Sequence, residues 1–287
     1  MLLARCTECE TSSVKGLDAQ LIHQVNLIKP GLLVRIDDIP QLRLGGSVHP
    51  WVQKGMRDCL VRLFKRYPDL ILIVNSAYRT IVGQALLFSH GENDRCNITI
   101  VAPPGASNHN NASSFDLDNW ADEYQGRRII DIMEDFGFSW LGRRMNDKMH
   151  FDCTQCIDMR GISIKAFQYL WNFANPADKL SVDGDYGQLV ASRLRISPIY
   201  GFPNLPTGYP PRILRFTEPL QAGNDVGRLQ LDLRAAGIKV GIADKIFGEG
   251  MKNAVMKYQA KVGMIADGVA GKATLIALNP PAPSNIA

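Results

Sequence analysis

The sequence predicts an α+β unit, a small antiparallel sheet with helices, followed by a small all-α three-helix module. Two observations carry this prediction. Through residues 1–160, segments with apolar side chains at helical spacing alternate with short β-branched runs. In residues 223–280 only the helical pattern remains, and short glycine-rich turns interrupt it.

Three segments support the α+β assignment of the first unit. Residues 49–70 (HPWVQKGMRDCLVRLFKRYPDL) have one apolar helical face and predict a helix that ends just before Pro68. Residues 70–80 (LILIVNSAYRT) are β-branched and apolar, which predicts a central strand. Residues 121–140 (ADEYQGRRIIDIMEDFGFSW) predict a second amphipathic helix that stops at Gly137.

Composition narrows the class of protein. The 287 residues are 46% hydrophobic and 21% charged, which is the profile of a globular chain and not of a disordered one. The net charge of +4 is mild, and no concentrated basic stripe points to nucleic acid. The longest apolar run, DLILIVNSAY, is shorter than the roughly 20 residues of a membrane span. The N-terminal stretch MLLARCTECETSS holds no recognisable signal peptide.

Four of the six cysteines form two C-x-x-C pairs, Cys6 with Cys9 and Cys153 with Cys156. The pairs could close a four-cysteine zinc site or two disulfides, or they could be free thiols in a reducing compartment. The spacing does not choose among these alternatives.

A change in composition separates the two ends of the chain. Residues 197–219 hold six of the sixteen prolines, which predicts a semi-extended linker over 203–222. The segments 244–255 and 267–278 repeat an Asp-x-x-x-Gly turn followed by a helical pattern, and 183–194 is a third copy. Glycine in such a turn tolerates positive φ, so the repeat is first of all a structural device.

The C-terminal module resembles the three-helix peptidoglycan-binding domain. The family pattern has a first helix with V-x-x-L-Q, then D-x-x-F-G and a helix with A-V-x-x-x-Q, then D-G-x-x-G-x-x-T. The matching residues are Val226, Leu229, Gln230, Leu233, Asp244, Phe247, Gly248, Ala254, Val255, Gln259, Asp267, Gly268, Gly271 and Thr274. Lys245 and Met251 depart from the pattern, where glycine and threonine are common. Residues 161–202 resemble a degenerate half of the same module, and the resemblance implies peptidoglycan as the partner.

The stretch SNHNNASSFDLD, residues 107–118, has the residue types of a metal site. Strand alternation in SSFDLD puts Asp116 on a polar face and Phe115 on an apolar one, and the turn-rich lead-in could fold His109 back toward Asp116. An imidazole and a carboxylate are two of the three protein ligands of a catalytic zinc. His150, in NDKMHFDC, is the best candidate for the third, and Asp147 three residues earlier suits a general base.

The other histidines fit this role less well. His23 and His49 lie upstream in segments without matching polar partners, and His90 follows the helical pattern QALLFSH, which predicts a histidine at a helix end.

Residues 70–152 resemble the zinc-dependent peptidases of the D-Ala-D-Ala carboxypeptidase and L-alanyl-D-glutamate endopeptidase family. The family pattern is S-x-H-x-x-G-x-A-x-D followed by D/E-x-x-H. The matching residues are Ser107, His109, Asp116, Asp147 and His150, while Ala112 and Ser114 replace the usual glycine and alanine. The resemblance implies a hedgehog/DD-peptidase-like catalytic fold over residues 1–160.

It also implies roles for individual residues. His109, Asp116 and His150 would bind Zn²⁺. Asp147 would be the catalytic base, and Arg79 would stabilise the substrate oxygen in the transition state. Ser107 and Gln84 would support the site. Neither the residues nor the resemblance indicates which side chains bind substrate.

The expected function is a zinc-dependent peptidoglycan hydrolase that cuts the stem peptide, either as a D-Ala-D-Ala carboxypeptidase or as an L-Ala-D-Glu endopeptidase. The alternative is a non-catalytic wall-binding protein with a structural or regulatory zinc site, as in hedgehog-type relatives. The expected location is the cell wall, periplasm or exterior, and a phage endolysin fits the missing signal. Which bond is cut and the oligomeric state stay open.

Overall fold

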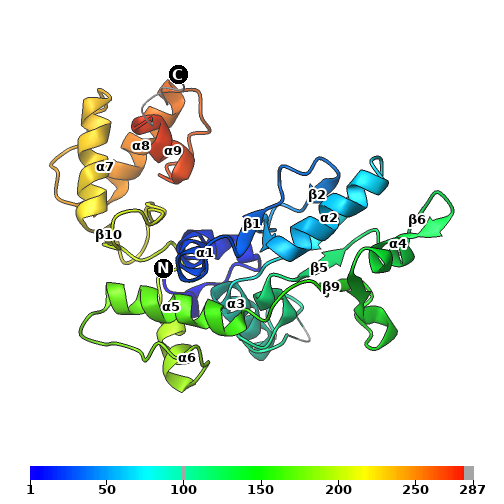
Figure 1. The fold of residues 1–287 in the computed structure, drawn as a ribbon. Coiled ribbons are helices and arrows are strands. Elements are labelled where there is room, and N and C mark those ends of the chain that lie inside the picture. Colours follow the sequence, from blue (N-terminus) through cyan, green and yellow to red (C-terminus); the bar gives the residue numbers. More distant parts are fainter. Residues whose placement is uncertain (99–100, 281–287) are drawn as a thin grey trace.

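The structure is a computed structural model that describes residues 1–98 and 101–280 (Figure 1). Its centre is a five-stranded sheet in the order β2-β4-β5-β9-β8. The strands are β2 (Leu42–Leu44), β4 (Leu72–Ser76), β5 (Ser114–Leu117), β9 (His150–Cys153) and β8 (Phe138–Trp140). All neighbours are antiparallel except β2 and β4, which are parallel.

The prediction of an antiparallel sheet is therefore wrong at one edge. Between β2 and β4 the chain passes through β3 (Trp51–Gln53) and α2 (Lys54–Arg66), and this crossover returns it in the same direction. β3 pairs instead with β1 (Leu33–Arg35) in a separate two-stranded sheet. The predicted helix over 49–66 consequently begins only at Lys54, and it ends at Arg66 as expected.

The predicted helix over 121–137 is correct only in its second half. It is α4 (Ile129–Asp135), preceded by a hairpin of β6 (Glu123–Tyr124) and β7 (Arg127–Arg128). Gln125 and Gly126 both have positive φ, 52° and 73°, which suits the tight turn between two antiparallel strands. Gly137, at φ 91°, ends the helical segment as predicted.

Apolar side chains form three clusters. The first packs α2 and α4 against the five-stranded sheet and includes the fully buried Phe115 and Phe151. The second joins α1 (Lys15–Ile28), α3 (Ile81–Glu92), α5 (Arg160–Ala174) and α6 (Gln188–Arg195), with Leu17 and Phe167 buried in it. Residues of the segment 161–202 thus share a core with the N-terminal helix, and α5 lies beside α1 (Figure 1).

Four short 3₁₀ turns lie among the described residues of the first 160. They are η1 (Leu3–Arg5), η2 (Thr11–Val14), η3 (Asn108–Asn111) and η4 (Leu141–Arg143).

The third cluster belongs to the C-terminal module, drawn yellow to red in Figure 1. The predicted three helices are α7 (Asn224–Ala235), α8 (Glu249–Lys261) and α9 (Lys272–Leu278). A two-stranded ribbon of β10 (Gln221–Ala222) and β11 (Ile246–Phe247) accompanies them, so the module is not purely helical. Leu214, from the proline-rich segment, is buried in the same cluster.

The three repeated turns share one hydrogen-bond arrangement. In each, a buried glutamine on the preceding helix donates its amide to the turn aspartate and accepts the N–H of the next residue. The sets are Gln168 with Asp183 and Gly184, Gln230 with Asp244 and Lys245, and Gln259 with Asp267 and Gly268. The Nε2–Oδ1 distances are 2.7, 2.8 and 2.7 Å, and the residue after each aspartate has positive φ. Segment 183–194 is therefore a true structural copy of the turn.

The structure decides among the alternatives for the cysteines. Cys9 forms a disulfide with Cys96, a residue outside both C-x-x-C pairs, so a four-cysteine zinc site cannot form. Cys6, Cys59, Cys153 and Cys156 are free. Local spacing could not reveal the Cys9–Cys96 bond, because 87 residues separate its two ends.

Within residues 1–98 and 101–280, none of the helices combines the length and the apolar character that a bilayer crossing demands.

Candidate metal centre

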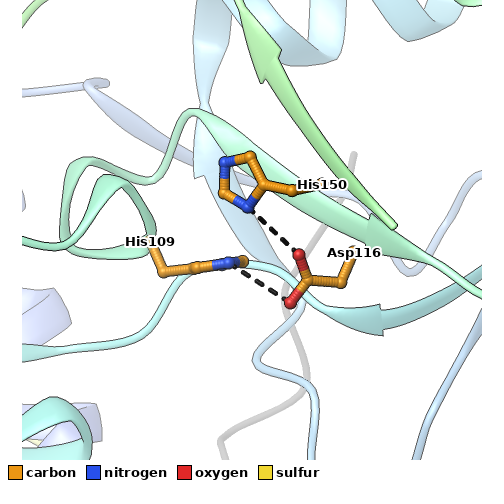
Figure 2. Close-up of side chains that lie close together, drawn as sticks. All are labelled: His109, Asp116 and His150. Atoms are coloured by element: carbon orange, nitrogen blue, oxygen red, sulfur yellow. Dashed lines mark hydrogen bonds and ion pairs between the residues drawn. The ribbon is translucent and has the colours of Figure 1, made fainter. Parts of the chain in front are cut away.

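His109, Asp116 and His150 meet on one face of the central sheet (Figure 2). Asp116 on β5 is the direct cross-strand partner of His150 on β9, so the two side chains lie on the same face. His109 comes from η3 (Asn108–Asn111), the turn that leads into β5. Each residue offers one ligand atom, and these atoms lie within 4.8 Å of one another. The three residues predicted as ligands are therefore brought together.

The Asp116 carboxylate lies between the two imidazoles. Its Oδ2 is 3.2 Å from Nε2 of His109, and its Oδ1 is 3.2 Å from Nδ1 of His150 (Figure 2). The two rings are almost perpendicular, with centroids 4.9 Å apart. Both histidines are buried, and Asp116 is partly exposed. Three donor atoms thus converge on one point from three directions.

The turn that carries His109 is fixed by its own polar residues. The Ser107 hydroxyl accepts the backbone N–H of His109 at 3.2 Å. Asn110 donates its side-chain amide to the carbonyls of Arg79 and Thr80. Ala112, which ends the turn, is fully buried at φ 51°.

The φ of Ala112 explains why the family pattern has glycine at this position. Glycine adopts this left-handed conformation freely, whereas alanine there costs about 1 kcal/mol. The turn nevertheless keeps the conformation that places His109 beside Asp116.

Each histidine has an acceptor on the ring nitrogen that faces away from Asp116. His109 Nδ1 is 2.9 Å from the Ala77 carbonyl oxygen, and His150 Nε2 is 2.9 Å from Oδ1 of Asp152. In the neutral rings that a metal would need, a proton on those nitrogens leaves the lone pairs on His109 Nε2 and His150 Nδ1, the nitrogens on the side of Asp116. Outer acceptors of this kind orient metal-binding imidazoles in proteins.

Asp152 is the functional residue that the sequence reasoning missed. It is held in turn by Ser114 Oγ at 2.6 Å and by Asn108 Nδ2 at 3.0 Å. Ser114 is the second residue that departs from the pattern described above, and its hydroxyl donates a hydrogen bond to Asp152. Strand alternation could have found Asp152, because residues 150 and 152 of one strand share a face.

The electrostatics of the cluster favour a cation. Burial alone would raise the pKa of Asp116, but the hydrogen bonds to His109 and His150 outweigh burial and hold that pKa well below its usual range. Burial likewise opposes a charged His150, yet Asp116 and Asp152 raise its pKa to about 9. In the metal-free cluster the two carboxylates thus favour a protonated His150, and a metal cation at this position would replace that proton.

The donor set fits zinc. Two imidazole nitrogens and one carboxylate oxygen form a His₂-carboxylate set, which zinc accepts while keeping one position open. The geometry shows that a metal can be held here, and it does not by itself identify the ion.

Asp147 lies at the edge of the cluster. Its Oδ2 is 3.9 Å from His150 Nδ1, and its side chain is about half exposed, with a relative accessibility of 51%. The segment that carries it is tied down by Trp140, whose Nε1 donates to the Lys148 carbonyl at 2.8 Å. Asp147 is therefore near the ligand atoms but not buried among them.

Arg79 is joined to the turn of His109, since its backbone N–H donates to the His109 carbonyl at 3.1 Å. Its guanidinium donates to Gln84 Oε1 and to Ser76 Oγ, both at 3.0 Å. Gln84 is buried and is itself fixed by a bond to the Ala102 carbonyl. Within the described part of the chain, no carboxylate oxygen comes within 4.0 Å of the Arg79 guanidinium. The arginine is held in place while its charge stays free for an anionic group.

A cavity of about 190 Å³ adjoins Arg79 and Ser76 and reaches His49. The expectation that His49 lacks a polar partner is wrong, since its Nε2 lies 2.5 Å from Oδ2 of the buried Asp18. Asp18 is 31 residues away, so the local sequence could not show this pairing. His90, as predicted, lies near the end of its helix, α3.

Comparison with known proteins identifies the C-terminal part of the chain. Residues 222–278 match the family model described as "Putative peptidoglycan binding domain". The C-terminal module is a peptidoglycan-binding domain. This confirms the resemblance drawn from residues 223–280 and supports a cell-wall association.

A relative among characterised proteins is the N-acetylmuramoyl-L-alanine amidase CwlM of Mycobacterium tuberculosis. It is 42% identical over 64 residues, which are 22% of this chain and 16% of the amidase. The likeness therefore extends over a segment of the size of one module.

Proposed function

We propose that the chain is a zinc-dependent peptidoglycan hydrolase that cleaves a peptide bond of the stem peptide. The observation that carries the proposal is the His109–Asp116–His150 cluster, whose imidazoles are both oriented by outer acceptors. The peptidoglycan-binding domain in the same chain supports the choice of substrate. The similarity to an amidase over 64 residues is compatible with a hydrolase of the cell wall.

Zinc, when bound, supplies a Lewis acid and acidifies water at its open position. Asp147 would accept a proton from the attacking water, because its carboxylate lies beside the ligand atoms. Its exposure allows it to swing toward the leaving amine and deliver the proton there. An aspartate buried among the ligands would instead compete for the metal.

Arg79 stabilises the negative charge that develops on the substrate oxygen. A guanidinium already held by Gln84 and Ser76 needs little rearrangement when this charge appears. Burial lowers the pKa of Arg79, yet the nearby Asp116 charge opposes this effect, so the side chain stays cationic.

Two bonds suit this machinery, the terminal D-Ala-D-Ala bond and the L-Ala-D-Glu bond, so the proposal covers a carboxypeptidase and an endopeptidase. Mass spectrometry of peptidoglycan fragments after digestion by the zinc-loaded chain separates them. Loss of one alanine indicates the carboxypeptidase, and a released peptide that begins with D-Glu indicates the endopeptidase.

Two results would contradict the proposal. Release of stem peptides that begin with L-Ala would show an amidase. A zinc-loaded chain that binds the wall without forming any product would favour the non-catalytic alternative, in which zinc is structural or regulatory.

A further inference from the structure

A groove of about 730 Å³ lies between the N-terminal unit and the C-terminal module, away from the metal centre's own residues. Residues of α1, β1 and β3 line one side, and α9 lines the other, with residues 208–213 between them. Its volume lies within the range of sites for small ligands, roughly 300–1,000 Å³. Neither the proposed metal chemistry nor the hydrogen bonds within the module account for it.

Aromatic rings line the side formed by the N-terminal unit. Trp51 on β3 is half-buried, and His23 and Tyr209 pack edge to face with ring centroids 4.8 Å apart. Aromatic faces of this kind bury the apolar faces of sugar rings while their polar edges stay hydrated. This side of the groove is therefore suited to a saccharide.

The charge of the groove has a single sign. Lys15, Arg35 and Lys272 are among its lining residues, and no aspartate or glutamate is. Arg35 is paired with Asp37 and lies over the ring of Trp51, so its charge is largely neutralised within the protein. Lys272 on α9 is exposed, and among the described residues no carboxylate lies within 4.0 Å of it. The groove is therefore lined by a free cation as well as by the aromatic rings.

We propose that this groove binds a segment of peptidoglycan glycan that carries no stem peptides and is therefore anionic, held by both units at once. The glycan alternates N-acetylglucosamine with N-acetylmuramic acid. Where no stem peptide is attached, the lactyl carboxylate of N-acetylmuramic acid is free, and it would pair with Lys272 while a neighbouring sugar ring packs on Trp51. The inference rests on the wall-binding part of the proposed function, because α9 lies inside the matched residues 222–278. A glycan chain that contacts both sides of the groove would hold the two units on the same glycan chain.

The test uses the full zinc-loaded chain and a tetrasaccharide of two N-acetylglucosamine–N-acetylmuramic acid pairs without peptides. Isothermal titration compares wild type with Trp51→Leu, His23→Ala and Lys272→Glu. Lys257→Glu is the matched control, because Lys257 is exposed on α8 and does not line the groove. A neutral chitotetraose is the second probe.

We expect Trp51→Leu and Lys272→Glu each to weaken tetrasaccharide binding about tenfold, the effect of losing one central contact. His23→Ala should weaken it less, and Lys257→Glu should not change it. Chitotetraose should bind wild type more weakly than the anionic probe, and Lys272→Glu should not affect its binding. Melting temperatures confirm that the variants fold. If Trp51→Leu does not fold, His23→Ala tests the contribution of the aromatic residues in its place.

The proposal is overturned if wild type does not bind the tetrasaccharide, or if the groove variants bind it as wild type does. It also fails if only Lys272→Glu weakens binding, since the module alone would then hold the glycan. Equal binding of chitotetraose would exclude the role of the carboxylate. The probe contains no peptide bond, so none of these results bears on stem-peptide hydrolysis.

Discussion

His150 Nε2 lies 2.9 Å from Oδ1 of Asp152, while Nδ1 of the same ring faces Asp116. The ring is thus clamped between two carboxylates with different roles. Asp116 would bind the metal that we propose, and Asp152 would hold the proton on Nε2 that leaves Nδ1 free. Loss of such an outer contact typically lowers metal affinity 10–100-fold.

We therefore expect Asp152→Asn to weaken zinc binding by about 10–100-fold while the fold is retained. An asparagine can still accept a hydrogen bond, but it lacks the charge that favours the oriented ring. Competition with a chromogenic chelator measures the affinity, and Asp69→Asn, at an exposed site far along the sequence, is the control. Wild-type affinity in Asp152→Asn would remove Asp152 from the account.

Arg79→Lys should reduce turnover of the stem peptide by about 10²–10³-fold, the cost of losing one fixed donor to a developing oxyanion. Lysine keeps the charge, but its ammonium group lacks the planar, forked donors with which the guanidinium bonds Gln84 and Ser76 at once. Zinc content, measured in parallel, should stay at the wild-type level. A large loss of zinc together with activity would mean that Arg79 supports the ligands and not the transition state.

Gln168→Ala should destabilise the N-terminal unit by about 1–3 kcal/mol, because it leaves the Gly184 N–H and the Asp183 carboxylate without their buried partner. All four tryptophans lie outside the C-terminal module, so urea unfolding followed by tryptophan fluorescence reports on this unit. Gln259→Ala removes the same arrangement from the module and should leave that transition unchanged. Equal shifts in both variants would show instead that the chain unfolds as one cooperative unit.

Burial, with a contribution from Cys153, raises the pKa of the Cys59 thiol from 9.0 to about 11. The thiol is therefore protonated in the folded protein at pH values where the unfolded chain begins to ionise. Protonation of the Cys59 thiol in the folded state therefore adds to the free energy of unfolding. This contribution is complete below pH 9 and is lost as the pH rises through about 11. Urea midpoints between pH 8 and 11 should fall less steeply in Cys59→Ala than in wild type, and parallel slopes would contradict the assignment.

The meeting of His109, Asp116 and His150 could be predicted because their positions follow from local rules. Alternation in β5 fixed the face of Asp116, and the polar turn before it accounted for His109. The repeated Asp-x-x-x-Gly turns were visible for a similar reason, as repeated short spacings, whereas the glutamine that holds each aspartate was not predicted. The usual glycine at position 112 also has a local reason, because this residue has a positive φ.

What could not be predicted depends on contacts between distant residues. The parallel pairing of β2, the Cys9–Cys96 disulfide and the Asp18–His49 pair all join segments whose sequences contain no mark of one another. The β6–β7 hairpin was missed for a different reason, since its residues continue the amphipathic pattern of α4.

The most direct test of the central claim is a zinc titration of the chelator-treated chain, with stem-peptide product measured by mass spectrometry. We expect product formation to rise in proportion to added zinc and to level off at one equivalent per chain. Asp116→Ala should form no product at that zinc concentration, whereas Asp118→Ala, two residues along the same segment and exposed, should behave as wild type. Product formation without zinc, or wild-type activity in Asp116→Ala, would contradict a catalytic metal at His109, Asp116 and His150.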